Sequence, residues 1–271
     1  MAKIKLNHSV SPKLITIVTV TLNAVSDLER TLSSIADQNH ELYELIVIDG
    51  LSNDGTLQVL EKYKNIISDF VSEPDDGIYD AMNKGLRLAR GNWIYFLNAG
   101  DVLIDGALEK ISDRLGDTGD IVHFNCRVHD NKGHQIPVRR YPKSEICLES
   151  WPCIQHQSVL VGRTLFERLG GFSTSYFILS DYEFFCRAKS KGARYKFYPN
   201  IYISIYNAEG VSASYASITT ILYEAIQIQK YYFKGFSVLF ALSMVTKAFV
   251  GLFDRNKRVS NLLRRCFLVK R

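Results

Sequence analysis

The sequence predicts an α/β protein with a mostly parallel sheet, helices on both faces and a helical tail at the C-terminus. Short apolar runs rich in β-branched and aromatic residues alternate with helix-like segments four times in the first hundred residues. Each run ends abruptly in small polar or acidic residues. Because ligands of such sheets bind beyond the carboxyl ends of the strands, the same pattern predicts where a site lies.

The first half of the chain supplies the parallel part of this sheet. The β-branched run 14–20 is the expected first strand. Ser26 and Glu29 have the spacing of a capping box, which begins the first helix. The other expected strands are 45–48, 69–72 and 93–97, and the other expected helices are 56–63 and 78–89. This alternation favours parallel pairing, since a crossover helix returns the chain to the same end of the sheet.

The second half, from residue 102, looks mixed rather than parallel. Strands are expected at 120–128, 135–139, 157–161 and 195–206, and helices at 163–169 and 181–191. The Asn-Lys-Gly of residues 131–133 is a hairpin turn signal between the first two of these strands. The hairpin carries three histidines that we expect to face solvent, His123, His129 and His134. The chain has no internal repeat or low-complexity linker, so residues 1–214 are expected to form one domain.

Polar residues follow the first two strands at the edge where ligands bind. They lie in residues 21–23 and 49–56. A carboxylate at a strand end, such as Asp49, can accept a hydrogen bond from a base N–H or a ribose hydroxyl. The alternative is an ordinary strand–turn–helix connection with Asp and Ser as turn formers. The segment lacks the lysine of a P-loop, and the chain has no GxGxxG, which argues against nicotinamide and flavin enzymes.

A third polar segment, residues 72–85, contains four carboxylates and opens a helix. Acids at a helix N-terminus are favoured by the helix dipole, so part of this pattern is structural. Lys84 can line a sugar site or pair with Asp80 at i,i+4, and the sequence leaves both roles open.

Residues 98–101 (Asn-Ala-Gly-Asp) end the fourth strand of this half. The position suits a hard divalent cation, because magnesium is held by one or two carboxylates together with substrate phosphates. On its own the segment is also compatible with a plain polar turn.

Together these segments resemble the N-terminal half of glycosyltransferase family 2. The resemblance rests on residues 19–38, 44–56 and 72–101, which occur in the family's order and spacing. It covers 14–101 with high specificity and continues more weakly to about residue 212. It implies a GT-A (Rossmann-like) fold, and an inverting, metal-dependent transfer from a nucleotide diphosphate-sugar. The nucleotide-sugar half is then 14–101 and the acceptor half is 102–214.

The resemblance also implies roles for individual residues. The nucleotide would be held by Thr21, Asn23, Asp49 and Ser52, with Asp49 on the base. Asp75, Asp80 and Lys84 would line the donor site. Residues 98–101 occupy the family's DxD position, with Asn98 where many members have aspartate. Asp101 would be the main protein ligand of Mn²⁺ or Mg²⁺, and the diphosphate would supply further oxygens.

Inversion needs a carboxylate that takes the proton of the acceptor hydroxyl. Residues 180–183 (Ser-Asp-Tyr-Glu) follow a Gly-Gly-Phe turn and resemble the family's acidic motif. We assign the base to Asp181, for which a helix N-cap is the structural alternative and Glu183 the competitor. His156, in a His-Gln pair found in part of the family, is expected at the metal, the diphosphate or the acceptor, with a structural role as the alternative.

Composition and charge limit the partners. The hydrophobic fraction of 46% can supply a sizeable core. Residues 234–271 carry nine basic side chains and one acid, a net charge of +8, which leaves −3 on the rest of a chain with +5 in total. A nucleic-acid footprint over the domain is therefore not expected. Five cysteines with no CxxC pair and a polar N-terminus indicate reduced thiols and a cytoplasmic protein.

The basic tail, 215–271, has three interpretations. Its last part has the pattern of a basic amphipathic helix, which suits the inner face of the cytoplasmic membrane and its anionic lipids. The alternatives are a helix that packs on the domain or on a second subunit of a homo-oligomer, and a membrane span, for which the apolar run 236–253 is marginal.

The predicted function is transfer of a sugar from a nucleotide diphosphate-sugar to a growing, lipid-linked cell-surface glycan. A UDP-sugar is the favoured donor and a GDP-sugar the second choice. The alternative is a nucleotide-sugar-binding protein without catalysis, which Asn98 keeps open. A sugar nucleotidyltransferase is disfavoured, since its glycine- and arginine-rich phosphate loop is absent.

Overall fold

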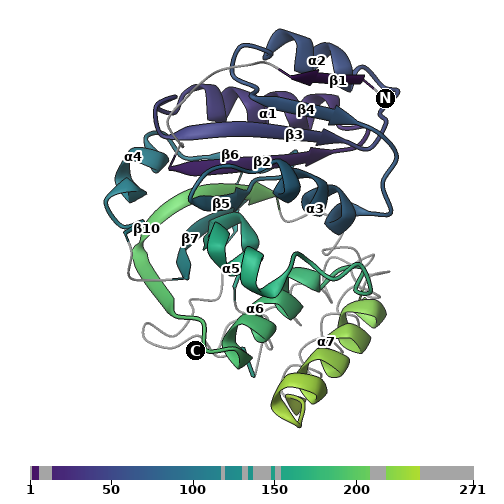
Figure 1. Ribbon diagram of the computed structural model, residues 1–271, viewed down its shortest axis with the longest axis vertical. Coiled ribbons are helices and arrows are strands. Elements are labelled where there is room, and N and C mark those ends of the chain that lie inside the picture. The colour runs from purple at the N-terminus through teal and green to yellow at the C-terminus, as the bar shows by residue number, and fades with distance from the viewer. Residues whose placement is uncertain are drawn as a thin grey trace, which may run out of the picture.

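The computed structural model describes residues 2–5, 14–116, 120–129, 134–136, 148–149, 154–207 and 218–238. One ten-stranded sheet runs through these residues, in the order β1-β4-β3-β2-β5-β9-β7-β10-β6, and β8 pairs with β7 (Figure 1). The strands are β1 (Ala2–Lys5), β2 (Ile15–Thr21), β3 (Tyr43–Asp49), β4 (Asp69–Ser72), β5 (Trp93–Phe96), β6 (Val102–Leu103), β7 (Ile121–His129), β8 (Gln135–Ile136), β9 (Val159–Gly162) and β10 (Tyr195–Asn207).

The helices connect these strands and cover them. They are α1 (Val25–Ala36), α2 (Thr56–Lys62), α3 (Ile78–Leu88), α4 (Ala107–Ser112), α5 (Arg163–Leu169), α6 (Ser180–Ser190) and α7 (Ile218–Phe233), with a 3₁₀ turn η1 (His156–Ser158). The α/β class and the helices on both faces are as the sequence predicts, and α4, β1 and β6 were not predicted.

The expected parallel half is confirmed. β2 pairs in parallel with both β3 and β5, and β3 pairs in parallel with β4. The register puts Thr21 opposite Asp49 and Asp49 opposite Ser72. Three polar strand ends therefore lie side by side at one edge of the sheet, where the sequence places the site.

The second half is mixed, also as expected. β9 is antiparallel to β5 and β7, while β10 is parallel to β7 and antiparallel to β6. β9 begins two residues later than predicted, because Gln157 and Ser158 belong to the turn η1. This turn carries His156 to the same sheet edge.

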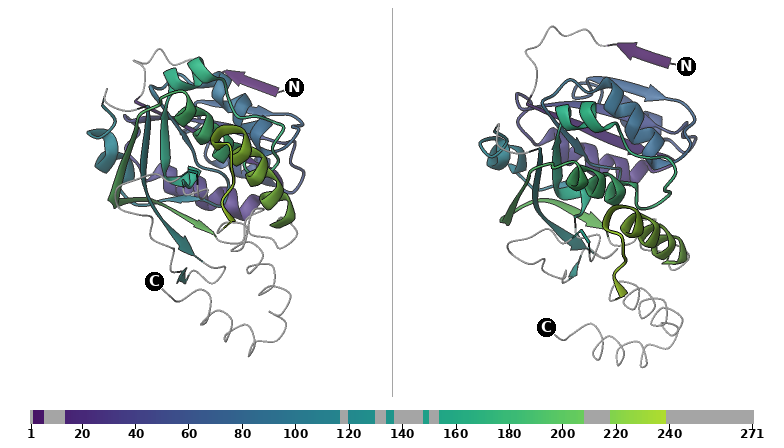
Figure 2. Two further views of the ribbon diagram at one scale, coloured as in Figure 1. Left: turned by 90° about the horizontal axis from the view of Figure 1, so that it is seen from below. Right: turned by 60° about the horizontal axis from the view of Figure 1, so that its bottom comes forward.

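Alternating side chains divide the core into two layers, one on each face of the sheet. On one face α1, α2 and α4 pack on residues such as Ile17, Leu45 and Tyr95. On the other face α3, α5, α6 and α7 pack on residues such as Val18 and Ile46. Figure 2 shows these helices from two further sides, with α7 alongside α6.

The helix α7 lies in the part of the chain that the sequence assigns to the tail, yet it packs on the domain. Ile221, Ala225 and Ile228 are buried in the same core cluster as α6. Residues 239–271, with the expected basic amphipathic helix, lie outside the described residues. Within the described ranges, every helix is too short or too polar to cross a membrane.

Two expectations about local structure are wrong. Ser26 and Glu29 form no capping box, because α1 begins at Val25 and its cap has no side-chain bond. Instead, Thr56 at the start of α2 accepts from the N–H of the N-cap Ala24, and Asp54 of the β3–α2 loop accepts from the N–H of Val25. His123 does not face solvent, because only the end of β7 belongs to the hairpin with β8 and His123 lies before that end. Its surface is 3% exposed, and its ring stacks on Phe197.

Candidate functional site

The side chain of Asp49 organises the strand end of β3. It is fully buried and accepts hydrogen bonds from the hydroxyls of Ser52 at 2.5 Å and Ser72 at 2.6 Å. The backbone N–H of Ser52 also donates to it, at 3.1 Å. A buried carboxylate needs such donors, because an unpaired charge in the protein interior is costly. Asp49 thereby fixes the loop that carries Ser52.

Asn23 and Thr21, from the end of β2, complete this edge. The backbone N–H of Asn23 donates to Ser52 Oγ at 2.7 Å, and Asn23 Oδ1 accepts from the backbone N–H of Asn53 at 2.9 Å. Thr21 Oγ1 is buried and has no hydrogen-bond partner among the described residues. The four residues predicted to hold the nucleotide are thus adjacent, and one buried hydroxyl there is still unpaired.

The acidic segment between β4 and α3 folds over the same edge. A Cβ atom built on Gly50 would lie 2.6 Å from Asp75 Oδ2, so this carboxylate sits against the loop that follows β3. Asp75 Oδ1 accepts the N–H of Gly77, which begins the turn into α3. Asp75 therefore lies beside the loop that follows β3.

Lys84 pairs within this segment rather than lying free. Its ammonium is 3.3 Å from Asp80 and 3.3 Å from Glu73, and it donates to Pro74 O at 2.5 Å. Burial works against the charged form of Asp80, but hydrogen bonds from the Asp76 backbone and from Lys84 lower the pKa of Asp80 below its ordinary value. The i,i+4 pairing left open by the sequence is therefore present.

Thr31 of α1 holds the turn after β5 in place. Its hydroxyl accepts from the N–H of Gly100 at 3.0 Å and donates to Asp101 O at 2.7 Å. The N–H of Ala99 donates to Val20 O at 3.1 Å, which ties the turn to β2. Residues 98–101 are thus fixed next to the end of β2.

The side chains of Asp101 and Asn98 suit a divalent cation that arrives with a diphosphate. Burial raises the pKa of Asp101 to about 7, against the lowering effects of His156 and of the Asn98 backbone. Asn98 Oδ1 is buried without a hydrogen-bond partner in the described part of the chain. A cation would stabilise the charged carboxylate and use the free amide oxygen. The described residues hold no cluster of three or more His, Cys, Asp or Glu side chains for a metal, so a cation at this turn would need ligands beyond these side chains.

His156 bridges this turn and the predicted base. Its Nε2 lies 3.2 Å from Asn98 Nδ2, and its Nδ1 lies 3.2 Å from Asp181 Oδ2. Burial lowers the pKa of His156, but the hydrogen bond and charge of Asp181, with the charge of Asp101, raise it overall. The histidine predicted at the site therefore contacts groups from both ends of it.

Asp181 sits in the first turn of α6 and not at its N-cap, which is Leu179. Its Oδ1 accepts from the backbone N–H of Tyr182 at 2.8 Å and from the Tyr79 hydroxyl at 3.1 Å. Its side chain keeps 16% of its surface exposed. Asp181 is thus an oriented carboxylate that a substrate hydroxyl can reach.

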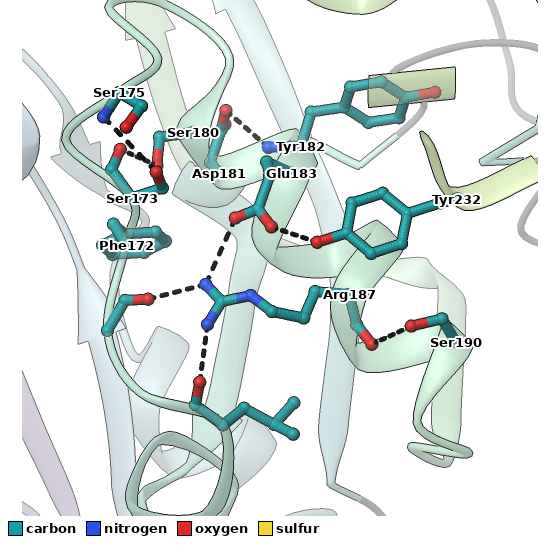
Figure 3. A network of polar contacts seen from close by, with 12 residues as sticks. Phe172, Ser173, Ser175, Ser180, Asp181, Tyr182, Glu183, Arg187, Ser190 and Tyr232 are labelled. Carbon is teal, nitrogen blue, oxygen red and sulfur yellow. Dashed lines mark hydrogen bonds and ion pairs between the residues drawn. The ribbon is translucent and has the colours of Figure 1, made fainter. Parts of the chain in front are cut away.

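Glu183 points to another side of α6 (Figure 3). It lies 3.2 Å from Arg187 Nη2 and accepts a hydrogen bond from the Tyr232 hydroxyl. Arg187 also donates to Leu169 O at 2.6 Å and to Gly171 O at 2.7 Å, so it links Glu183 to the glycine turn before α6. These contacts tie Glu183 to Arg187 and α7, whereas Asp181 is the carboxylate that contacts His156.

Sequence reasoning missed several residues that shape the site. Tyr79 and Thr31 occupy ordinary buried positions of their helices, and only the fold shows which loops their hydroxyls contact. Gln155, next to His156, accepts from Cys126 Sγ at 2.5 Å and donates to the Tyr206 hydroxyl at 2.9 Å. Its position next to His156 was the only indication in the sequence that Gln155 lies near the site.

Comparisons with known proteins show the family and the fold of this chain. The family model described as glycosyl transferase family 2 matches residues 16–174. A PGL/p-HBAD biosynthesis glycosyltransferase of Mycobacterium bovis is 30% identical over 204 residues, which is 72% of this chain and 77% of the relative. A putative teichuronic acid biosynthesis glycosyltransferase, TuaG of Bacillus subtilis, is 35% identical over 100 residues, covering 36% of this chain and 40% of its own length.

Solved structures share the fold. TarS 1–349 of S. aureus in complex with UDP superposes with a TM-score of 0.60 at 18% identity, over 80% of this chain and 70% of that chain. The mannosyltransferase PcManGT from Pyrobaculum calidifontis, in complex with GDP-Man and Mn²⁺, has a TM-score of 0.60 at 20% identity, over 83% of this chain and 66% of that one. With the family match and the sheet described above, they show that this chain is a glycosyltransferase of family 2 with the GT-A fold.

Proposed function

We propose that this glycosyltransferase is an inverting, metal-dependent enzyme that moves a sugar from a nucleotide diphosphate-sugar to a growing, lipid-linked cell-surface glycan. The observation that carries the proposal is the position of His156. It contacts Asp181, the proposed base, and Asn98, at the proposed diphosphate end. One side chain therefore connects the two groups that must act on opposite sides of the sugar.

The donor nucleotide would bind at the strand ends of β2 and β3. The proposed contacts are Thr21, Asn23, Asp49 and Ser52, with Asp75, Asp80 and Lys84 around the sugar and diphosphate. The unpaired Thr21 hydroxyl supports this, since a buried polar atom without a partner is costly until a ligand pairs with it. A UDP-sugar is the favoured donor and a GDP-sugar the second choice, since solved relatives of this fold are complexes of UDP and of GDP-Man.

The cation, Mn²⁺ or Mg²⁺, would be held by Asp101, with Asn98 Oδ1 as a second oxygen. When bound, it neutralises negative charge that develops on the departing diphosphate. The asparagine at position 98 leaves the site with one protein carboxylate instead of two, so the cation is expected to bind weakly without the nucleotide.

Asp181 would act as the general base. The acceptor hydroxyl oxygen attacks the anomeric carbon as the bond to the diphosphate oxygen breaks, and the hydroxyl proton passes to Asp181. Tyr79, Tyr182 and His156 hold the carboxylate in one orientation. Attack from the face opposite the leaving group inverts the configuration of the anomeric carbon.

The acceptor and the location of the enzyme are inferred from the named relatives and from the charge of the tail. The relatives from M. bovis and B. subtilis are named for the biosynthesis of PGL/p-HBAD and of teichuronic acid, which supports a biosynthetic glycan acceptor. We propose that the basic segment 234–271 binds anionic lipids at the inner face of the cytoplasmic membrane, with contact to a second subunit as the alternative. We propose that the catalytic domain is 1–214 together with the docked α7.

The test is a screen of UDP-, GDP- and dTDP-sugars with Mn²⁺, first by thermal shift and then by turnover with a polyprenyl-linked acceptor. A donor that binds the native state raises the melting temperature. We expect one donor class to stabilise the protein and to be consumed by the wild type but not by Asp181→Asn. Stabilisation without any donor turnover, even with acceptor, would instead favour a binding protein without catalysis.

A further inference from the structure

We propose that Glu224 of α7 is a positioning residue for the catalytic base, a role that rests on the proposed function of Asp181. Glu224 lies in the segment that the sequence assigns to the tail. It is nevertheless 6% exposed and faces the loop that leads into α6.

The carboxylate of Glu224 accepts hydrogen bonds from three consecutive backbone N–H groups. Glu224 Oε1 accepts from the N–H of Phe177 at 2.7 Å. Glu224 Oε2 accepts from the N–H groups of Ile178 at 3.1 Å and Leu179 at 2.8 Å. Charge-assisted bonds of this kind are stronger than bonds between neutral groups, so both oxygens of Glu224 restrain the loop.

The three donors immediately precede the helix that carries Asp181. Leu179 is the N-cap of α6 and supplies no side-chain capping bond, while, among the N-terminal N–H groups, that of Tyr182 donates to Asp181 Oδ1. Such groups need partners when they are buried. Glu224 gives a partner to the N–H of Leu179 and to the two N–H groups before it, and its carboxylate lies where the helix dipole favours an anion.

The same loop is tied to the base through Tyr79. The Tyr79 hydroxyl lies 2.6 Å from Ile178 O and 3.1 Å from Asp181 Oδ1. Ile178 is thus held by Glu224 through its N–H and by Tyr79 through its carbonyl. A shift of this peptide would move the hydroxyl that orients Asp181.

The helix α7 also holds the residues on the other side of Asp181. Gln229 donates to the Tyr182 hydroxyl at 3.0 Å, and the Tyr232 hydroxyl donates to Glu183. Residues 177–179 and 182–183 are therefore attached to α7, while Asp181 between them faces His156 and Tyr79. This pattern makes α7 a support for the base and not only a cover for the core.

The experiment compares Glu224→Gln with Ile228→Ala in the full chain. The first change keeps the shape of the side chain and removes one acceptor oxygen, and the second weakens the apolar packing of the same helix. We expect Glu224→Gln to lower kcat at least tenfold. The KM for the donor should stay within about twofold, because the proposed nucleotide contacts lie at the ends of β2 and β3, away from the loop that Glu224 holds. Ile228→Ala should keep kcat within about twofold at temperatures where it is folded.

Hydrogen exchange provides a second measurement that does not depend on activity. Amides 177–179 should exchange at least tenfold faster in Glu224→Gln than in Ile228→Ala. Wild-type kcat or wild-type exchange in Glu224→Gln would overturn the proposal. If Glu224→Gln does not fold, Tyr79→Phe measures the same connection by removing only the bridging hydroxyl, and an unchanged kcat in that variant contradicts it.

Asp181→Asn separates this proposal from the function on which it rests. If Asp181→Asn is inactive and Glu224→Gln is normal, only the positioning role fails. If Asp181→Asn retains turnover, Asp181 is not the base and both proposals fail. The combined variant Tyr79→Phe/Glu224→Gln should lose less than the product of the single effects, because both changes release one loop.

Discussion

Two carboxylates, two residues apart on α6, should give opposite results when each is neutralised. Glu183→Gln removes the charge that faces Arg187, and Asp181→Asn removes the charge that faces the site. Glu183 Oε2 lies 3.2 Å from Arg187 Nη2. The Glu183 side chain is 7% exposed and the Arg187 side chain is 21% exposed. At an effective dielectric constant of about 20, such a pair attracts by about 5 kcal/mol.

The net loss in Glu183→Gln is smaller than this attraction. A neutral side chain no longer has to be desolvated as an ion, and the amide can still bond to one neighbour. Arg187 keeps its two carbonyl partners. We expect the free energy of unfolding to fall by about 2–3 kcal/mol. For a protein of this size, that loss lowers the melting temperature by roughly 4–12 °C.

The assay is thermal unfolding and initial-rate kinetics on both variants, at a temperature where each is folded. Glu183→Gln should keep kcat within about twofold. Asp181→Asn should keep a melting temperature within about 2 °C of the wild type and lose roughly 10²–10⁴ in kcat, the usual contribution of a general base. A hundredfold loss of kcat in folded Glu183→Gln would refute the assignment of roles, as would near-normal turnover by Asp181→Asn.

Three further predictions concern stability and ligands. Leu51 has a φ of +70° and is 58% exposed. Leu51→Gly should relieve roughly 1–2 kcal/mol of backbone strain and lose about 0.5–1 kcal/mol through the greater flexibility of glycine in the unfolded chain. The urea midpoint should therefore rise, and a lower midpoint would contradict this. Burial lowers the pKa of His123 to about 3, so only the unfolded chain gains its proton between pH 6.5 and 3, and folding loses about 2 kcal/mol at pH 5. His123→Phe should flatten this dependence in urea titrations at pH 7 and 5, and an unchanged slope would count against it. Asp101→Asn should abolish the extra thermal stabilisation that Mn²⁺ adds to UDP, with UDP alone as the control; retained Mn²⁺ dependence would exclude Asp101 as the ligand.

The sequence was sufficient for elements set by local pattern. The strands β2 to β5 and the helices between them follow from apolar periodicity, and α5 matches its predicted bounds. The same reasoning brought Thr21, Asn23, Asp49 and Ser52 to one edge, because parallel strands end together.

What the sequence did not predict depends on contacts between distant segments. Both Asp181 and Glu183 are carboxylates in the same short motif, so the sequence cannot distinguish them. They differ only in the fold, where Glu183 contacts Arg187 and Tyr232. His123 has the same local context as His129, and its burial follows from the pairing of β7 with β9 and β10. The sequence left open whether the tail packs on the domain, since an amphipathic pattern is common to helices that bind a membrane and helices that dock. The structure shows that α7 docks on α6.

The contacts of Glu224 have a consequence for how the enzyme matures. Phe177 and its acceptor are 47 residues apart in the chain, so the loop before α6 can be held only after α7 has been synthesised. The strands β2 to β5 all precede α6 in the chain, so they can pair earlier on the ribosome, before α7 is made. On the proposed function, a nascent chain that stops before α7 has the strand ends of the donor site but lacks the restraint on its base, so sugar transfer waits until the protein is nearly complete.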